Sequence, residues 1–197
     1  MDIDIVERRA GYQGYFRLDI YRLRHRLHDG GWSGVMQREV LERGHAAAAL
    51  LYDPARDAVV MIEQLRVGAL AAGRPAWLRE VVAGIIETGE DAVDVARREA
   101  QEEAGCVVGD LRLIADFLVT PGCSSETIRL YFATVDARGL GGVHGVKEEH
   151  EDIRVVVVPW AEARADLDAG RIGNAVALIA LQWLALNRER VRAAAGA

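Results

Sequence analysis

The chain has few cysteines and no excess of positive charge, and each shortage excludes a class of protein. Its 197 residues include two cysteines, Cys106 and Cys123. Two are too few for a disulfide scaffold and are typical of free thiols in a reducing compartment. Acidic residues outnumber Lys and Arg by 30 to 24, which gives a formal net charge of -6. We therefore expect neither nucleic acid nor an anionic membrane as a partner.

The chain also lacks a long apolar run and a secretory leader. The longest apolar stretch, Ala175 to Leu186, is interrupted by Gln182 and is too short to span a bilayer. Residues 1–5 are acidic and do not have the basic-then-apolar order of a signal peptide. These observations predict a cytoplasmic protein.

The N-terminal region has the pattern of a small β-sheet. Apolar and polar residues alternate over residues 15–27, and a second β-like stretch covers residues 35–42. Such a sheet cannot close a core alone and must pack on the rest of the chain or on a second copy. We therefore predict a homodimer and two regions, residues 1–43 and residues 44–197.

The remaining chain predicts an α+β fold. Two apolar runs, 46–52 and 58–65, flank an Asp- and Pro-containing turn and predict a hairpin. Further strands are predicted over 113–120, 128–135 and 153–158, and helices over 91–104, 160–169 and 174–192. In the first helix Asp91 is the expected N-cap, and Gly105 follows the last turn. Many strands with few helices indicate an α+β sandwich.

Acidic residues gather at the end of the helix predicted over 91–104. Glu99 and Glu103 share a face, with Glu102 at its edge. They repel one another and face the negative end of the helix dipole, so a cation should compensate. Arg98 can neutralise part of this charge, but a magnesium ion shared with substrate phosphates would neutralise more. The alternative for this short segment alone is a solvated acidic surface without function.

A longer pattern around these acids disfavours that alternative. Gly84 is followed after five residues by Glu90 and after seven more by the segment REAQEEAGC, residues 98–106. This order matches the signature of the Nudix superfamily. Ala100 and Cys106 are small where larger aliphatic residues are usual, and neither position carries an acid.

The similarity extends along nearly the whole chain. Segments such as GYFRLDIYRLRHRL, VVMIEQLR, PAWLREVVAGIIETGE, FLVTPGCSSE and GVKEEHEDIRV resemble the ADP-ribose pyrophosphatases of the Nudix superfamily. The resemblance implies the Nudix αβα sandwich with an N-terminal antiparallel sheet, exchanged between the subunits of a homodimer. It also implies hydrolysis of ADP-ribose to AMP and ribose 5-phosphate with several magnesium ions per active site, manganese being the alternative. Residues 1–43 would then serve dimerisation and adenine contacts, and residues 44–197 would form the catalytic domain.

The resemblance assigns roles to individual residues. It places metal ions on the carbonyl of Ala83 and the carboxylates of Glu99, Glu102, Glu103 and Glu151. It places adenine against Tyr15 and Phe16 with Arg38, Glu39 and Arg43 in the same pocket, the diphosphate on Arg66, and the terminal ribose near Ile85, Thr120, Pro121, Gly122 and Glu126. Relatives often carry a second glycine where this chain has Cys123.

The acidic loop of residues 145–152 supplies the expected general base. Glu149 is assigned to remove the proton of the attacking water, because a loop carboxylate needs only modest proton affinity and correct reach. Glu148 is the adjacent alternative. By pattern alone this loop would be a solvated charge run, and His150 has no partner at the spacing of a zinc site.

Other interpretations stay open at the level of sequence. Tyr15 and Phe16 by pattern alone fit a core or a dimer interface, and Arg38, Arg43 and Arg66 fit solvated strand edges. The substrate could be another nucleoside diphosphate derivative, such as a sugar nucleotide, NADH or a dinucleoside polyphosphate. A non-catalytic ADP-ribose sensor is a further alternative, against which the intact acids of the signature argue.

Overall fold

A computed structural model describes residues 2–146 and 150–197. The chain forms two compact units. We call Met1–His45 with Phe117–Thr127 the sheet unit, and Ala46–Asp116 with Ile128–Ala197 the core unit. The domain boundary expected between residues 43 and 44 stays a prediction.

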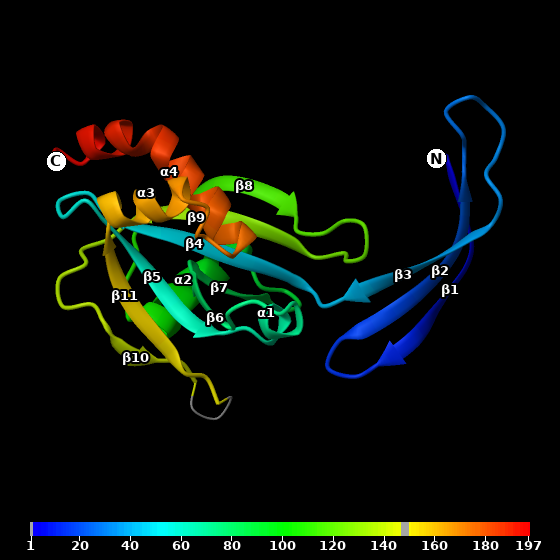
Figure 1. The fold of residues 1–197 in the computed structure, drawn as a ribbon, viewed down its shortest axis with the longest axis horizontal. Helices are drawn as coiled ribbons and strands as arrows, with labels where there is room; N and C mark the ends of the chain where they lie inside the picture. The colour runs from blue at the N-terminus through cyan, green and yellow to red at the C-terminus, as the bar shows by residue number, and fades with distance from the viewer. Residues whose placement is uncertain (1, 147–149) are drawn as a thin grey trace. The chain divides into compact units, whose positions relative to one another are not determined.

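The sheet unit contains a three-stranded antiparallel sheet in the order β1-β2-β3 (Figure 1). Its strands are β1 (Ile3–Gln13), β2 (Arg17–His25) and β3 (Met36–Glu42). The N-terminal antiparallel sheet is thus confirmed, with β2 and β3 inside the predicted stretches. No strand was predicted at β1, because its pairing with β2 shifts register between Ile5 and Glu7 and between Ala10 and Tyr12. Such bulges interrupt the period-two pattern that identifies a strand in sequence.

The segment Phe117–Thr127 belongs to the sheet unit because it bonds to β3. The amide of Leu41 donates to the carbonyl of Cys123 at 2.8 Å, and the amide of Ser125 donates to the carbonyl of Leu41 at 3.2 Å. The Ser125 hydroxyl also donates to Glu42 at 2.5 Å. These bonds join two segments that are far apart in the sequence.

The core unit is built on a mixed sheet in the order β10-β11-β5-β4-β9-β8. Strand β4 is parallel to β9 and antiparallel to β5. The strands are β4 (His45–Asp53), β5 (Ala58–Leu65), β8 (Arg112–Leu118), β9 (Thr127–Thr134), β10 (Gly142–His144) and β11 (Ile153–Pro159). The predicted hairpin is present, and Asp53 Oδ1 accepts the amides of Ala55 and Arg56 in its turn.

Strands β4 and β5 pair only next to their hairpin turn. The pairing covers Leu51–Asp53 and Ala58–Val60, after which β6 (Trp77–Glu80) pairs with β5 and β7 (Val82–Ile86) pairs with β4. The short helix α1 (Val67–Ala71) precedes β6. Sequence analysis predicted no strand at β6 or β7, because the two strands are short and only Val81 lies between them.

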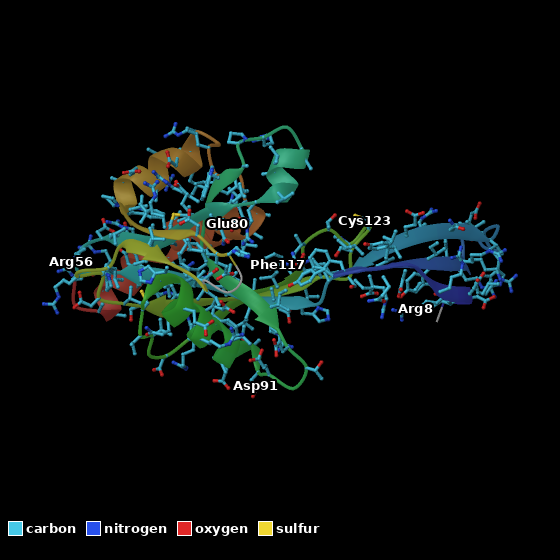
Figure 2. All side chains as sticks on the ribbon, turned by 90° about the horizontal axis from the view of Figure 1, so that it is seen from below. Arg8, Arg56, Glu80, Asp91, Phe117 and Cys123 are labelled. Carbon is cyan, nitrogen blue, oxygen red and sulfur yellow. The ribbon has the colours of Figure 1, made fainter. Side chains whose placement is uncertain are left out.

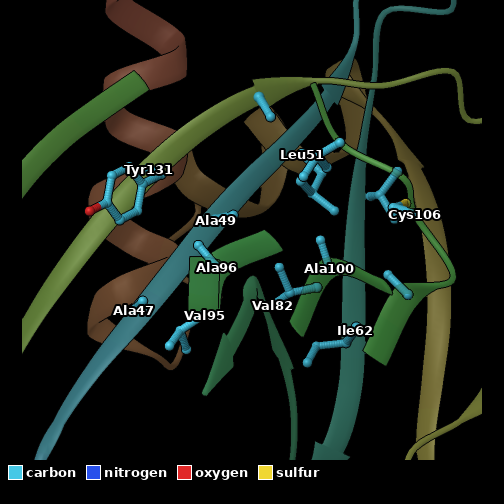
Figure 3. Packing of buried hydrophobic residues seen from close by; sticks show 14 of the residues in the cluster. Ala47, Ala49, Leu51, Ile62, Val82, Val95, Ala96, Ala100, Cys106 and Tyr131 are labelled. Atoms are coloured by element: carbon cyan, nitrogen blue, oxygen red, sulfur yellow. The ribbon is translucent and has the colours of Figure 1, made fainter. Parts of the chain in front are cut away.

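Helices cover both faces of this sheet, which confirms the α+β prediction (Figure 1). The helices are α2 (Ala92–Ala104), α3 (Trp160–Asp168) and α4 (Ala175–Ala194). Ala47, Ala49 and Leu51 of β4 share a buried cluster with residues of α2 (Figure 3). Tyr131 of β9 belongs to the same cluster, whereas the next ring, Phe132, contacts Trp183 of α4 at 5.0 Å between centroids. Neighbouring residues of a strand therefore pack on helices that cover opposite faces of the sheet.

Helix α2 begins and ends where the sequence predicted. Asp91 occupies the N-cap position, but its side chain accepts no capping hydrogen bond. Gly105 has a φ of 64° in the left-handed region, and the amide of Cys106 reaches back to the carbonyl of Ala100. This termination favours glycine and fixes the direction of the chain after the acidic turn.

Two composition-based expectations can be compared with the structure. Cys106 and Cys123 are both free, as predicted. Within residues 2–146 and 150–197, no helix combines the length and apolarity needed to cross a membrane.

Asp57 anchors the C-terminal helix to the β4–β5 turn. Its carboxylate accepts from the Tyr52 hydroxyl at 2.6 Å and from Arg188 Nε of α4 at 2.7 Å. Burial, with Asp57 adding to it, raises the pKa of Tyr52 to about 12, and the bond from Arg188 lowers the pKa of Asp57. Asp57 has a φ of 52°, a conformation that Asn also tolerates.

We expect Asp57→Asn to lower the free energy of unfolding by about 1–3 kcal/mol, because it removes the charge-assisted bonds without changing the turn. Urea unfolding measures the difference. The control is Asp168→Asn, which breaks an exposed ion pair with Arg164 and should change stability by no more than about 0.5 kcal/mol. Equal effects of the two substitutions would contradict an anchoring role.

Candidate functional site

The acidic residues of α2 pack against β7. The amide of Ala83 donates to Glu103 Oε2 at 2.9 Å. At Gly84, an added Cβ would lie 1.8 Å from Glu99 Oε1, so any larger residue would displace that carboxylate. The glycine of the signature is therefore required by the close approach of a glutamate to the strand.

Arg98 binds the exposed side of this cluster. Its Nη1 lies 2.7 Å from Glu99 Oε1 and 3.1 Å from Glu102 Oε2, and its Nη2 lies 3.6 Å from Glu90. One guanidinium thus contacts three acids of the signature, which reduces the repulsion noted in the sequence.

Glu103 is the most deeply buried acid of the cluster, with 5% of its surface exposed. Burial raises the pKa of Glu103 to about 8, although the Ala83 amide acts in the opposite direction. The charges of Glu99 and Glu151 raise this pKa further, and Arg66 lowers it. The charges of Glu151 and Arg66 thus both act on the Glu103 carboxyl.

The donor set fits a hard divalent cation, although the side chains do not form a finished cage. In the described ranges, no three Asp, Glu, His or Cys side chains lie close enough together to hold a metal ion as they stand. In this arrangement Arg98 forms ion pairs with both Glu99 and Glu102. A cation would nevertheless supply the positive charge that the buried Glu103 needs, and carboxylate oxygens are the ligands that magnesium prefers.

The raised pKa of Glu103 predicts a pH-dependent effect of metal on stability. Its pKa is about 8 in the folded protein, against a reference value of 4.5. Between pH 4.5 and about 8, Glu103 of the metal-free protein is therefore protonated in the folded state and ionised in the unfolded state. The stability that this proton contributes is complete below about pH 4.5 and is lost as pH rises through about 8.

Because a cation requires the ionised carboxylate, the gain in Tm from magnesium should be larger at about pH 9 than at about pH 6. Thermal unfolding in magnesium and in EDTA at both pH values measures the gain. A gain that is the same at the two pH values would contradict the prediction.

Arg66 follows β5 and is held from one side by an acid that sequence analysis missed. Glu80 of β6, labelled in Figure 2, is buried and accepts from Arg66 Nε at 2.8 Å. The Arg66 side chain stays 44% exposed. The available signal was an acid, next to Arg79, inside the largely apolar segment of residues 76–86.

In the sheet unit, Tyr15 and Phe16 lie in the turn between β1 and β2. Their ring centroids are 4.8 Å apart in an edge-to-face arrangement, and Tyr15 is 87% exposed. Together with four neighbours they line a pocket of about 430 Å³. The lining residues are Tyr12, Tyr15, Phe16, Arg17, Leu18 and Leu41. The exposure of Tyr15 argues against a core role within the chain.

Other predicted residues meet at the edge of this pocket. The Arg43 guanidinium lies 5.5 Å from the Phe16 ring centroid and forms a 2.9 Å ion pair with Glu126. Sequence analysis missed Tyr12, which also lines the pocket. The Tyr12 ring lies over Gly14, since a Cβ added at Gly14 would be 2.6 Å from the Tyr12 hydroxyl oxygen. The pocket thus combines aromatic walls with a paired arginine, which suits a flat ring.

Arg38 and Glu39 are not among the residues that line the pocket. Both are exposed on β3, and Arg38 donates to the carbonyl of Gln37 at 2.8 Å. The loop Thr120-Pro121-Gly122 forms a turn in which the amide of Ser124 donates to the carbonyl of Thr120 at 3.0 Å.

The remaining predicted residues belong to the core unit. Ile85 is half-buried on β7, next to Gly84. Glu151 Oε2 accepts the amide of Val146 at 2.9 Å, so this side chain bonds within its own loop. Glu149 and Glu148, the candidate bases, lie outside the described residues.

Residues 42–178 match the family model described as NUDIX domain. The chain belongs to the Nudix family. This range contains Gly84 and the α2 acids, so the Nudix signature identified in the sequence is confirmed.

Nudix relatives match over most of the chain. An ADP-ribose pyrophosphatase of Escherichia coli (strain K12) is 47% identical over 191 residues, covering 97% of this chain and 91% of the relative. The protein of the same name from Haemophilus influenzae is 42% identical over 194 residues, covering 97% and 89%. A GDP-mannose pyrophosphatase of Enterobacter sp. (strain 638) is 36% identical over 154 residues, covering 77% and 78%.

A solved structure supports the Nudix fold. The crystal structure of an ADP compounds hydrolase matches with a TM-score of 0.73 and 19% identity, covering 98% of this chain and 97% of that one. At this identity the similarity concerns the fold alone.

Proposed function

We propose that the chain hydrolyses ADP-ribose to AMP and ribose 5-phosphate. Water attacks one phosphorus atom, and the bond from that phosphorus to the bridging oxygen breaks, so that each product keeps one phosphate. The observation that carries the proposal is the 47% identity, over 97% of the chain, to a relative named ADP-ribose pyrophosphatase. The carboxylates packed on β7 supply the chemistry that such a reaction requires.

The proposed cofactor is magnesium, with manganese as the alternative, and several ions bind per site. When bound, such ions neutralise phosphate charge and make water more acidic. Glu99, Glu102, Glu103, the Ala83 carbonyl and Glu151 would hold them. Arg66 binds diphosphate oxygens, since a guanidinium fork matches phosphate geometry, and Glu149 accepts the proton of the attacking water.

The remaining substrate contacts are proposed from the same resemblance. Tyr15 and Phe16 stack on adenine with Arg43 in the same pocket, and Glu126, which pairs with Arg43, contacts the terminal ribose. Arg38 and Glu39 would complete the base pocket, and Ile85 and the loop of residues 120–122 would contact the terminal ribose.

The proposed assembly is a homodimer in the cytoplasm. Strand β1 exposes Ile3, Ile5 and Val6 by about half of their surfaces, and a three-stranded sheet gains stability when an apolar face is covered. The two free cysteines support a reducing compartment.

A substrate panel tests the proposed function. ADP-ribose, GDP-mannose, NADH and a dinucleoside polyphosphate are incubated with magnesium, and the products are identified by mass. We expect ADP-ribose to have the highest kcat/KM, with AMP as a product. GDP-mannose is the second candidate, because a relative that is 36% identical carries that substrate in its name. Binding of ADP-ribose without turnover would instead indicate a sensor.

Tyr15→Ala and Phe16→Ala should each raise the KM for ADP-ribose roughly tenfold and change kcat by less than about threefold, because stacking on a remote base is mostly uniform binding. Steady-state kinetics measures both constants. The matched control is Trp32→Ala, which removes a partly exposed ring of the same unit that stacks with Arg24 and Arg26 outside the pocket. Loss of folding without a separable rise in KM would support a structural role for Tyr15 and Phe16.

A further inference from the structure

Glu80 is a buried carboxylate with partners on both of its oxygens. Only 3% of its surface is exposed. Oε2 lies 2.8 Å from Arg66 Nε, 2.7 Å from Arg66 Nη2 and 3.3 Å from Gln64 Nε2. Oε1 accepts from Asn174 Nδ2 at 2.6 Å. A buried acid is tolerated when it is paired and hydrogen-bonded in this way.

The placement of Glu80 follows from the sheet. On β6, Glu80 is opposite Ile62 of β5, and Arg79 is opposite Glu63. Because neighbouring strand residues face opposite ways, Arg79 contacts Glu162 at 2.9 Å on an exposed surface, while Glu80 faces Arg66. The two adjacent residues thus form one exposed and one partly buried ion pair.

The bonds to Glu80 occupy one edge of the Arg66 guanidinium. Nε and Nη2 both point to the same carboxylate oxygen, which leaves the N–H bonds of Nη1 on the other side of the fork. A free arginine side chain samples many rotamers, and fixing one of them on binding has an entropic cost. A guanidinium that is already held avoids much of this cost when it meets phosphate oxygens.

Asn174 connects this pair to the start of α4. Its Oδ1 accepts the amide of Ala177 at 2.9 Å as the N-cap, and its Nδ2 donates to Glu80. Asp would cap the helix equally well but would place a second negative charge against Glu80. Ala would lose both contacts. Asparagine suits this position because its amide oxygen accepts from Ala177 and its amide nitrogen donates to Glu80.

We propose that Glu80 is a positioning residue for substrate binding, acting through Arg66, and that Asn174 completes its support. The inference rests on the proposed function in assigning Arg66 to the diphosphate of a nucleoside diphosphate substrate. Arg66 also lowers the pKa of Glu103, so its charge reaches the acidic cluster. The N-terminus of α4 is in this way linked to the diphosphate-binding group.

The test compares Glu80→Gln and Asn174→Asp with the control Glu162→Gln, which breaks the exposed pair with Arg79. We expect Glu80→Gln to raise the KM for ADP-ribose about tenfold, with kcat changed by less than about threefold, because a charge-assisted contact of this kind is worth at least that factor. The Kd for ADP-ribose in EDTA, measured by calorimetry, should rise by a similar factor. Asn174→Asp should act in the same direction while keeping the helix cap, and Glu162→Gln should leave both constants unchanged.

A double-substitution cycle separates positioning from general stability. In the Arg66→Ala background, adding Glu80→Gln should raise KM by less than about twofold, because the residue through which Glu80 acts is gone. Wild-type KM and Kd in Glu80→Gln, alongside a raised KM in Arg66→Ala, would overturn the positioning role. A full additional rise in the double variant would overturn it as well.

The same variants distinguish failure of the positioning proposal from failure of the proposed function. If Arg66→Ala leaves KM unchanged for every substrate of the panel, the assignment of Arg66 to the diphosphate is wrong and the positioning proposal falls with it. If the protein hydrolyses a different nucleoside diphosphate, only the ADP-ribose proposal fails. The comparison of Glu80→Gln with Glu162→Gln is then decided with that substrate.

Discussion

Glu103→Gln should lower kcat/KM for ADP-ribose by at least about 100-fold at millimolar magnesium and at the same time raise the Tm of the metal-free protein above about pH 8. The activity is lost because an amide oxygen lacks the charge that draws a divalent cation out of water. Even groups that only support metal ligands are worth about 10–100-fold, which sets the lower bound for a direct ligand. The stability rises because the substitution removes a carboxylate whose burial holds its pKa at about 8.

Two measurements check this expectation. Steady-state rates over a range of magnesium concentrations should show partial recovery in the variant, and thermal unfolding in EDTA should show the gain in Tm. Asp94→Asn is the matched control, because Asp94 is an exposed acid in the first turn of the same helix. A variant with normal turnover and an unchanged magnesium requirement would remove Glu103 from the metal site.

Glu149→Gln should reduce kcat by roughly 100-fold or more, while ADP-ribose and magnesium still bind nearly normally. This range is typical for the loss of a general base. Glutamine keeps the size of the side chain but cannot accept the proton of the attacking water. The KM for ADP-ribose and the magnesium dependence should therefore change little, which separates this variant from Glu103→Gln.

The neighbouring acid provides the comparison. Glu148→Gln changes the same charge one position earlier in the chain and should stay close to wild type in kcat. Both variants are measured at saturating substrate and magnesium. Near-normal turnover of Glu149→Gln would exclude it as the base, and a large loss in Glu148→Gln alone would reassign the role to Glu148.

The sequence predicted those parts of the fold that repeat at a regular period. The acids of α2 were placed correctly because helical spacing puts Glu99 and Glu103 on one face, and the left-handed Gly105 marks the end of that helix. The β4–β5 hairpin was found because Asp and Pro interrupt two apolar runs. These signals are local, so one sequence is enough to detect them.

What the sequence did not predict depends on contacts between distant segments. Glu80 is identified as a buried partner of Arg66 and Asn174 only when β6, β5 and the start of α4 are brought together. Strand β1 escaped detection because bulges break its period, and β6 and β7 because a single residue separates them. Of the six residues that line the pocket near Tyr15, sequence analysis named only Tyr15 and Phe16, and it named them by resemblance.

The sheet unit is discontinuous in the chain, and this limits how it can be inherited or transplanted. Its segment Phe117–Thr127 reaches β3 through main-chain bonds at Leu41 and through the Ser125–Glu42 contact. A chimaera that takes only the first 45 residues from a relative would pair a foreign β3 with the resident loop. Residues 1–45 and 117–127 are therefore expected to change together during divergence, as a matched pair of segments separated by about 70 positions in the chain.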